Sequence, residues 1–261
     1  KYDDKNRMNV KIVPGADSVY IIYDPRDRLV LVQDSVLRLF NNWKFIKYDT
    51  LNRPVLTGVK QISGSRTSVQ NTVNSYYTNH RFCERRQGLA NTTDHGYTDN
   101  AYPSGVSDNE YLTVTYYDDY LFIYSSTNYG YPVSPAPPAP YNSNVKLDNP
   151  EGLVTGSRVR NLDNNAWYDG VVYYDKKYRV IYSVKANHKS GLEKVLSFSD
   201  FIGKIKNQRY IHSSSGLSNL VINKTFSYDH GDRLINIKYQ VADTGSWITI
   251  ATQSYNAIGQ L

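Results

Sequence analysis

Cysteine is nearly missing from this chain of 261 residues, which contains only Cys83. A lone cysteine cannot form a disulfide within the chain, so we expect stability to come from strand pairing and stacking. No run of about 18 apolar residues occurs, which excludes a membrane-spanning helix. The glycine-rich fingerprints of phosphate-binding and dinucleotide-binding loops are missing too, so the sequence indicates no nucleotide cofactor.

Metal and thiol motifs are also sparse. His80 and Cys83 have a spacing that could begin a metal site, but a second pair is missing. The same two residues could act as base and nucleophile, yet no pattern predicts an orienting group or oxyanion donors. The remaining histidines are far away in the sequence: His95, His188, His212 and His230. We therefore expect neither a metal site nor a thiol enzyme.

Charge does not single out a partner either. The net charge is +6 and the isoelectric point is near 9.1, but the 30 basic residues are spread along the chain. The densest cluster, Arg81, Arg85 and Arg86, is interrupted by Glu84. A nucleic-acid binder concentrates its charge on one stripe with aromatic residues between. No nucleic-acid partner is expected.

Tyrosine, in contrast, is abundant, with 25 residues against seven phenylalanines and three tryptophans. A tyrosine ring can bury its body and keep its hydroxyl in water. We therefore expect a sheet with one face toward solvent or a hydrated cavity, rather than a compact dry sandwich.

The tyrosines belong in part to a recurring six-residue motif that begins with tyrosine and aspartate. In its clear copies the sixth residue is arginine. The clear copies occupy residues 2–7, 23–28, 48–53, 174–179 and 228–233, and three weaker copies occupy 117–122, 199–204 and 255–260. A spacing of about 25 residues, interrupted by two insertions, is typical of a stacked array rather than of one globular core.

Each position of the motif has a physical role. The fifth residue is Asn, Asp or Gly in six copies, and these residue types tolerate the positive φ of a tight turn. The aspartate at the second position can accept hydrogen bonds from backbone N–H groups two or three residues later. The basic sixth residue can lie along the tyrosine of the same or a neighbouring repeat, with its charge near the aspartate. Each copy is therefore predicted to reverse the chain.

Asp118 and Asp119 lie inside one of the weaker copies. Paired carboxylates could serve glycosidic chemistry, but this position favours the capping of a turn. We therefore predict that the chain is not an enzyme and that it has no catalytic, cofactor-binding or metal residues and no cofactor.

Segments that follow the motifs are rich in β-branched and aromatic residues and are predicted to be strands. Such segments lie at residues 29–32, 54–57, 180–184, 220–222, 225–228, 234–239 and 247–251. The last four alternate with turns, which predicts an antiparallel meander. The expected fold class is all-β, with repetitive antiparallel β-hairpins in a spiralling sheet and one short helical insertion.

Two insertions divide the array. We expect motif repeats at residues 1–59, an insertion with a short helix at 60–110, a degenerate repeat at 111–130, a proline-rich linker or loop at 131–150, and further repeats at 151–261. Five prolines fall within residues 131–140 and predict an extended polyproline segment. A surface linker is the simpler interpretation, and a docking peptide for an aromatic groove is the sharper one.

The helix of the first insertion is predicted at residues 65–77. Thr67 or Ser68 could cap its N-terminus. Val69, Val73 and Tyr76 or Tyr77 fall at helical spacing and would form its apolar face.

The motif Tyr-Asp-x-x-(Gly/Asn/Asp)-Arg-(Leu/Val), repeated along most of the chain, resembles the YD repeats of the RHS-repeat family. That family includes bacterial polymorphic toxins, the C components of Tc toxins and the teneurins of animals. Residues 23–58 look similar to large secreted RHS-type proteins of the Bacteroidetes lineage. The resemblance implies part of a YD-repeat β-shell, a hollow wall that in toxin members encloses a C-terminal toxic domain. The family's conserved segment after the repeats, where toxin members are cleaved beside an aspartate, has no counterpart here, so neither autoproteolysis nor toxin activity is implied.

The expected function is therefore structural: a segment that encapsulates or presents a C-terminal, toxin-like domain of a secreted or surface protein of a bacterium. Both ends fall within repeats, so its expected partner is the remainder of a longer chain. The alternative is a cell-surface adhesion or carbohydrate-binding module, in which Trp43, Trp167 and Trp247 stack on sugar rings or a partner protein. Trp167 and Trp247 follow predicted turns, where packing between strands is the simpler role. An array cut through two repeats also leaves open strand edges, which favour association.

Overall fold

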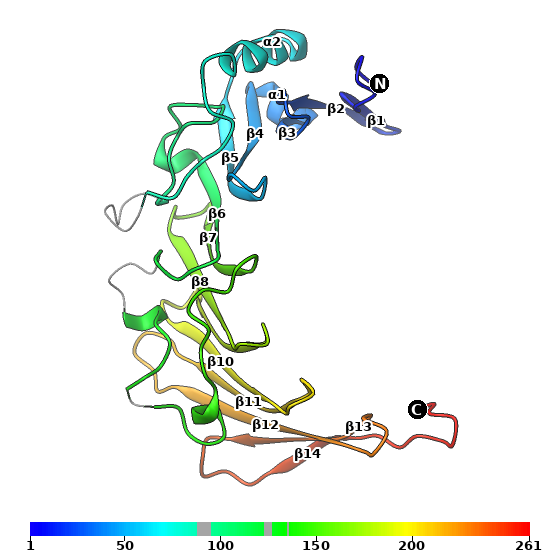
Figure 1. Cartoon of the computed structure of the whole chain (residues 1–261), viewed down its shortest axis with the longest axis vertical. Coiled ribbons are helices and arrows are strands. Elements are labelled where there is room, and N and C mark those ends of the chain that lie inside the picture. Colours follow the sequence, from blue (N-terminus) through cyan, green and yellow to red (C-terminus); the bar gives the residue numbers. More distant parts are fainter. Residues whose placement is uncertain (88–94, 123–126, 135) are drawn as a thin grey trace. The chain divides into compact units, whose positions relative to one another are not determined.

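The structure is a computed structural model that describes residues 1–87, 95–122, 127–134 and 136–261 (Figure 1). Parts of both predicted insertions and of the degenerate repeat lie outside these ranges. Within them, fourteen strands follow one another in chain order in one open sheet. The expected all-β class, built from repetitive antiparallel hairpins with a short helical insertion, is confirmed. No helix in the described ranges is long and apolar enough to cross a membrane.

The chain divides into two compact units. Unit 1 comprises residues 1–116 and 157–167, and unit 2 comprises residues 117–156 and 168–261. Unit 1 holds α1 (Ser35–Leu39), α2 (Arg66–Tyr76), β1 (Val10–Val13), β2 (Ala16–Tyr23), β3 (Leu29–Gln33), β4 (Asn42–Tyr48), β5 (Pro54–Gln61) and all but the last residue of β6 (Tyr111–Tyr117). Unit 2 holds most of β8 (Trp167–Tyr174), then β9 (Val180–Ala186), β10 (Leu192–Ser199), β11 (Ile205–His212), β12 (Leu220–Tyr228), β13 (Leu234–Val241) and β14 (Ile248–Thr252). Residues of β7 (Val154–Arg160) belong to both.

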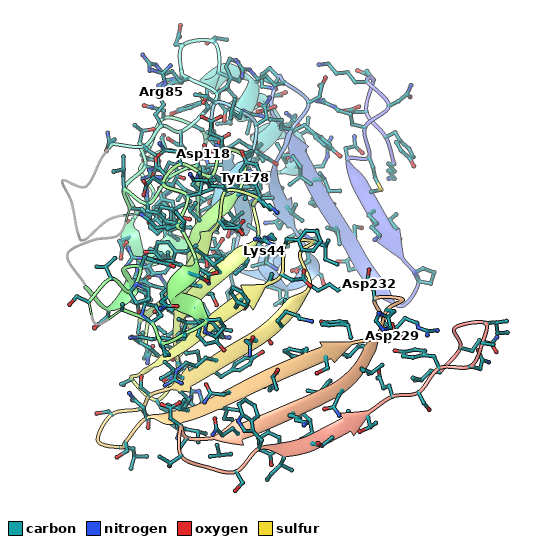
Figure 2. All side chains as sticks on the ribbon, turned by 60° about the horizontal axis from the view of Figure 1, so that its bottom comes forward. Lys44, Arg85, Asp118, Tyr178, Asp229 and Asp232 are labelled. Atoms are coloured by element: carbon teal, nitrogen blue, oxygen red, sulfur yellow. The ribbon has the colours of Figure 1, made fainter. Side chains whose placement is uncertain are left out.

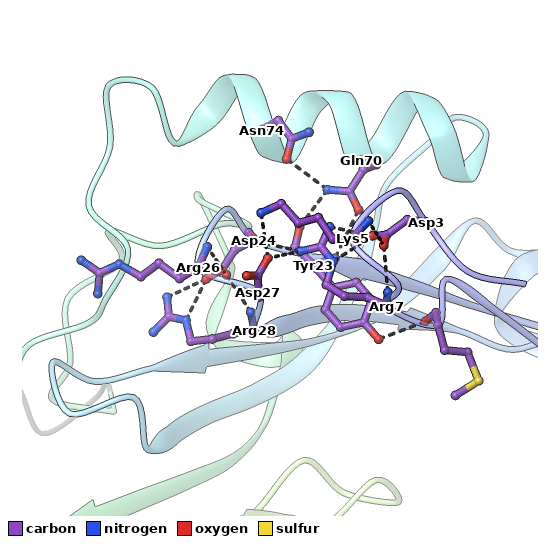
Figure 3. A network of polar contacts seen from close by, with 11 residues as sticks. Asp3, Lys5, Arg7, Tyr23, Asp24, Arg26, Asp27, Arg28, Gln70 and Asn74 are labelled. Carbon is purple, nitrogen blue, oxygen red and sulfur yellow. Dashed lines mark hydrogen bonds and ion pairs between the residues drawn. The ribbon is translucent and has the colours of Figure 1, made fainter.

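The six-residue motif closes a hairpin by hydrogen bonds within itself, as residues 24–28 show (Figure 3). The Asp24 N–H donates to the Arg28 carbonyl at 2.9 Å, and the Asp27 N–H donates to the Asp24 carbonyl at 3.0 Å. Asp27 has φ 65°, in the left-handed region. A type I turn followed by one left-handed residue is the usual three-residue hairpin loop, and the register shift next to it, between Ile22 and Tyr23, is the accompanying bulge.

The Asp24 carboxylate holds this loop together. Its Oδ1 accepts the backbone N–H groups of Arg26 and Arg28, both at 2.9 Å, and its Oδ2 accepts Nε of Arg28 at 2.8 Å. The prediction of a bond to the N–H two residues later is confirmed. The second bond reaches four residues later instead of three, because the left-handed fifth residue turns the sixth N–H back toward the aspartate.

Seven of the eight copies have a left-handed fifth residue. These residues are Asn6, Asp27, Asn52, Tyr178, Gly203, Asp232 and Gly259. Tyr178 is an aromatic residue at φ 59°, a conformation that its residue type did not predict. Asp229 and Asp232 lie together at the hairpin between β12 and β13 (Figure 2), where the Asp232 N–H donates to the Asp229 carbonyl at 3.0 Å.

The weak copy at residues 117–122 differs. Here Asp118 itself has φ 74°, and its Oδ1 accepts the Gly152 N–H at 2.8 Å. Asp119 Oδ1 accepts the Leu121 N–H at 2.9 Å. Both carboxylates thus cap backbone N–H groups, as predicted, but the motif does not close its own hairpin. Its sixth residue, Phe122, is apolar and buried where the clear copies have arginine.

Helix α2 falls within the predicted range of residues 65–77, and its N-cap is Ser65, whose side chain accepts the Ser68 N–H at 3.2 Å. The predicted cap at Thr67 or Ser68 is therefore wrong: Ser65 keeps an extended backbone while both later residues are already helical. Val69 and Val73 are buried, as expected.

Three further elements differ from the prediction. The short helix α1, capped by Asp34, was not predicted because five residues are too few to show a helical period. Residues 220–222 and 225–228 form the single strand β12. Trp247 precedes β14 instead of beginning it.

The side chain of Gln70 joins helix α2 to the sheet of unit 1 by hydrogen bonds. Gln70 Nε2 donates to the Tyr23 carbonyl at 2.7 Å, and Gln70 Oε1 accepts the Tyr23 N–H at 3.2 Å (Figure 3). The amide thus satisfies both backbone groups of a residue at the end of β2, much as a neighbouring strand would.

We predict that Asp24→Ala lowers the free energy of unfolding by about 3 kcal/mol, because two backbone N–H groups lose their acceptor and Arg28 loses its carboxylate partner. The side chains of Asp24 and Arg28 are 0% and 10% exposed, so water can replace few of the hydrogen bonds that are lost. Chemical denaturation followed by circular dichroism measures the change. As a control, Asp4→Ala removes an exposed carboxylate from another copy and should change the value by less than about 0.5 kcal/mol. Equal losses in the two variants would contradict this account of the turn.

Candidate functional site

The candidate functional feature is a set of contacts that joins each motif to the next. The Arg28 guanidinium lies 4.7 Å from the centre of the Tyr48 ring. The Tyr48 hydroxyl donates to the Leu29 carbonyl at 2.7 Å, and one terminal nitrogen of Arg28 donates to Asn52 Oδ1 at 2.9 Å. Three contacts therefore bind the repeat at residues 23–28 to the repeat at residues 48–53.

The same arrangement recurs in both units, and we call it the arginine–tyrosine ladder. The cation lies over the ring in Arg7–Tyr23 at 4.7 Å, Lys204–Tyr228 at 5.2 Å and Arg233–Tyr255 at 4.6 Å. In each pair the tyrosine hydroxyl donates to the carbonyl of the residue after the basic one, namely Met8, Ile205 and Leu234. The ring contacted is that of the following repeat, which decides between the two alternatives the sequence left open.

The basic sixth residue also binds the turn of the next copy. Arg7 donates to the carboxylate of Asp27, the fifth residue of the next copy, at 2.6 Å, and Lys204 forms an ion pair with Asp232 in the same way. Where the next copy begins with Ser199 instead of tyrosine, Arg179 donates to the Asp200 carbonyl at 2.6 Å. A cation over a ring contributes about 0.5–1 kcal/mol at partly exposed sites, and a hydroxyl bond adds about 1 kcal/mol.

A cluster of four tyrosines forms part of the core of unit 2. The Tyr173 ring stacks on Tyr120 at 4.5 Å and on Tyr182 at 5.7 Å, and Tyr131 packs edge-on against Tyr173 at 5.4 Å. Burial raises the pKa of Tyr120 and that of Tyr182 to about 12. These rings therefore stay neutral well above the usual range of a phenol.

The proline-rich segment lies against this sheet. Asn144 Nδ2 donates to the Ser197 carbonyl of β10 at 2.9 Å, and Tyr141 is buried. A groove of about 600 Å³ lies between the segment and β9–β11, lined by residues such as Pro132, Leu196 and Ile211. The segment is thus packed against an aromatic face of its own sheet.

The residues considered for metal or thiol chemistry are not brought together. His80 stacks on Tyr76 at 3.8 Å, and its Nδ1 contacts the Tyr76 carbonyl at 2.8 Å. Cys83 is partly buried and forms no disulfide. Elsewhere, His95 is buried and its ring is 4.3 Å from that of Tyr111, His212 contacts Glu193, and His188 and His230 are exposed. Among the described residues, no three His, Cys, Asp or Glu side chains are grouped to hold a metal ion.

The three tryptophans occupy different surroundings. Trp43 is fully buried in unit 1 and donates to the Ile62 carbonyl at 3.2 Å. Trp167 is covered by the Arg158 and Arg160 guanidinium groups at 5.0 and 4.2 Å. Trp247 is 47% exposed. A sugar ring could therefore reach Trp247 most readily.

Sequence reasoning missed a buried charge cluster in unit 1. Lys47 and Glu84 are both 0% exposed, and their Nζ and Oε1 atoms are 3.3 Å apart. Lys47 also forms an ion pair with Oδ1 of Asp99. The detectable signal was the alternation of β4, in which Trp43, Phe45 and Lys47 share the buried face. Glu84, which interrupts the basic cluster in the sequence, belongs to this site instead of the surface.

We predict that Tyr48→Phe lowers the free energy of unfolding by about 1 kcal/mol, because the Leu29 carbonyl loses its donor. The ring and its contact with Arg28 remain in this variant. Tyr2→Phe, at a residue that is 69% exposed, is the matched control and should leave stability unchanged. Denaturant titration of both variants measures the difference, and an unchanged value for Tyr48→Phe would refute the stabilising role of this bond.

The tyrosine cluster predicts a loss of stability in alkali. A group whose pKa is raised by folding contributes stability that is complete below its unfolded value, here 10, and is lost as pH rises through the folded value. For Tyr120 and Tyr182 this window runs from 10 to about 12. The free energy of unfolding should fall across it, and Tyr182→Phe should make the fall shallower, whereas Tyr2→Phe should not. Equal pH dependence in all three proteins would contradict the prediction.

Comparison with known proteins gives a structural likeness but no sequence match. No known protein family matches the chain, and no curated protein matches its sequence. Among solved structures, the chain is similar to one in the crystal structure of TcdB2-TccC3-TEV, with a TM-score of 0.34 and 11% sequence identity. The match covers 98% of this chain and 12% of that one, so the chain spans about an eighth of the length of the protein it matches. At this level the likeness carries no argument about function.

Proposed function

We propose that this chain is a non-catalytic structural segment of a YD-repeat wall of the RHS type. The observation that carries the proposal is the arginine–tyrosine ladder, in which the sixth residue of one motif and the tyrosine of the next bind each other in the same way four times. The side chains that define the motif are thus used to join repeats. A device of this kind extends a sheet strand by strand.

The proposed context is a longer secreted or cell-surface bacterial protein, in which the sheet spirals into a shell that encapsulates or presents a C-terminal, toxin-like domain. This step rests on the resemblance of the motif to YD repeats. Because the ladder joins repeats whose strands differ in sequence, further repeats could be added to the wall without a binding pocket. The proposed partner is therefore the remainder of the same chain.

A surface adhesion or carbohydrate-binding role is the second candidate, and one observation favours it. Trp247 is 47% exposed beside Ile248 and Ile250, which are 51% and 50% exposed. Aromatic faces of this kind stack on sugars or partner proteins. Binding of the chain to a glycan array that Trp247→Ala abolishes, with the fold intact, would favour this role over the wall.

The wall proposal predicts that loosening the ladder exposes the enclosed domain. In the full-length protein, Asp229→Ala should speed proteolysis of the C-terminal domain at least tenfold under native conditions, because Arg233 loses the carboxylate that orients it over Tyr255. Asp4→Ala is the control and should not change the rate. A C-terminal domain that is cut at the same rate in the wild-type protein and in both variants would argue against enclosure.

A further inference from the structure

We propose that Lys47 and Asp99 of unit 1 are joined by an intramolecular amide bond that forms spontaneously on folding, with Glu84 carrying the protons. The inference rests on the buried charge cluster alone and is independent of the proposed function. A lysine amine, a carboxyl group and a second carboxyl group that contacts the amine are the three groups that such a condensation requires.

Burial of the cluster favours the uncharged form of the lysine amine that the reaction needs. Lys47 Nζ is fully buried, lies about equally far, 6.0 Å, from the centres of the Phe45 and Tyr111 rings, and contacts both carboxylates. Burial also raises the pKa of Tyr111, so its hydroxyl stays neutral beside the cluster. Holding the Lys47 and Glu84 ions away from water is costly, and the transfer of a proton from the ammonium to a carboxylate neutralises two of the three charges. The free amine produced in this way is the nucleophile.

Backbone groups hold each carboxyl group in a distinct role. Asp99 Oδ2 accepts the Gly105 N–H at 2.6 Å and the Val106 N–H at 3.4 Å. The other oxygen, Oδ1, contacts Lys47. Two N–H donors on one oxygen can stabilise the negative charge that develops there during attack at the carboxyl carbon. This oxygen would become the carbonyl oxygen of the amide.

Glu84 is held more firmly still. Its Oε2 accepts the Thr98 hydroxyl at 2.6 Å and the Asn100 N–H at 2.9 Å, and its Oε1 accepts the Ala101 N–H at 2.9 Å. The three donors come from residues on either side of Asp99. They fix Glu84 Oε1 at 3.3 Å from Lys47 Nζ, within range of the proton it must receive.

The reaction balances without any co-reactant. The ammonium and the Asp99 carboxylate together contain the atoms of one amide and one water molecule. Lys47 Nζ attacks Cγ of Asp99 to form the N–C bond, the Cγ–Oδ1 bond breaks, and Oδ1 leaves as water after Glu84 has passed it two protons from Nζ. Glu84 ends as it began. The 35% exposure of the Asp99 side chain gives the water a way out.

The bond would tie β4 to the insertion that covers it. Lys47 and Asp99 are 52 residues apart, so the amide would close a large loop and reduce the entropy of the unfolded chain in the manner of a disulfide. In a chain whose lone cysteine cannot supply such a link, this is a covalent alternative that reduction does not reverse.

Mass spectrometry of the intact, denatured chain tests the proposal. The wild-type protein should be lighter than its sequence by one water molecule, and trypsin should release a branched peptide that joins Lys47 to Asp99. Lys47→Met, Asp99→Ala and Glu84→Gln should each have the full mass of their sequence. Asp99→Asn has a side chain of the same shape and should lose ammonia instead, which brings it to the same final mass as the wild-type protein.

Two controls separate a failure of the chemistry from a failure to fold. Lys60→Met removes a half-buried lysine that binds Glu110 at 3.0 Å in the same unit, and this variant should still lose one water molecule. Circular dichroism of Glu84→Gln should match that of the wild-type protein. A folded wild-type chain of full mass that trypsin cleaves after Lys47 would overturn the proposal and leave the cluster an ordinary buried ion network.

Discussion

In most copies of the motif, the aspartate carboxylate at the second position is the group that holds the turn and its neighbours together. In the copy at residues 23–28, Asp24 binds two N–H groups of the loop and the side chain of Arg28. The loop is thereby closed and the guanidinium is oriented at the same time. Because that guanidinium then lies over Tyr48, one side chain connects the shape of a turn to the position of the next repeat.

A ladder of modest contacts can support a large sheet because the contacts repeat. Each contact is partly exposed and contributes little, but its partners are also held by hydrogen bonds within their own turns, so little further entropy is lost. The same reasoning explains why the array tolerates the weaker copies of the motif. Lys204 replaces arginine over Tyr228, and Arg179 binds a carbonyl where Ser199 replaces tyrosine.

The insertions have a different physical role from the repeats. In unit 1 the segment after α2 brings Glu84 and Asp99 over the buried face of β4, and in unit 2 the proline-rich segment packs on tyrosines of β8 and β9. Each therefore shields one face of a sheet whose residues are rich in tyrosine. The proposed amide bond would make the first of these covers permanent, and the proposed wall would then combine repeated weak links with one covalent one.

The turns, their spacing and most of the strands between them could be predicted from the sequence, because most of the turns are closed by groups within five consecutive residues, such as Asp24 to Arg28. A periodic motif of this kind is visible in the order of the residues along the sequence. The contact of the arginine with the tyrosine of the following repeat, and the burial of Lys47 with two carboxylates, became visible only in the folded chain. Asp99 is 52 residues from Lys47, and nothing local in either segment records which distant surface covers it.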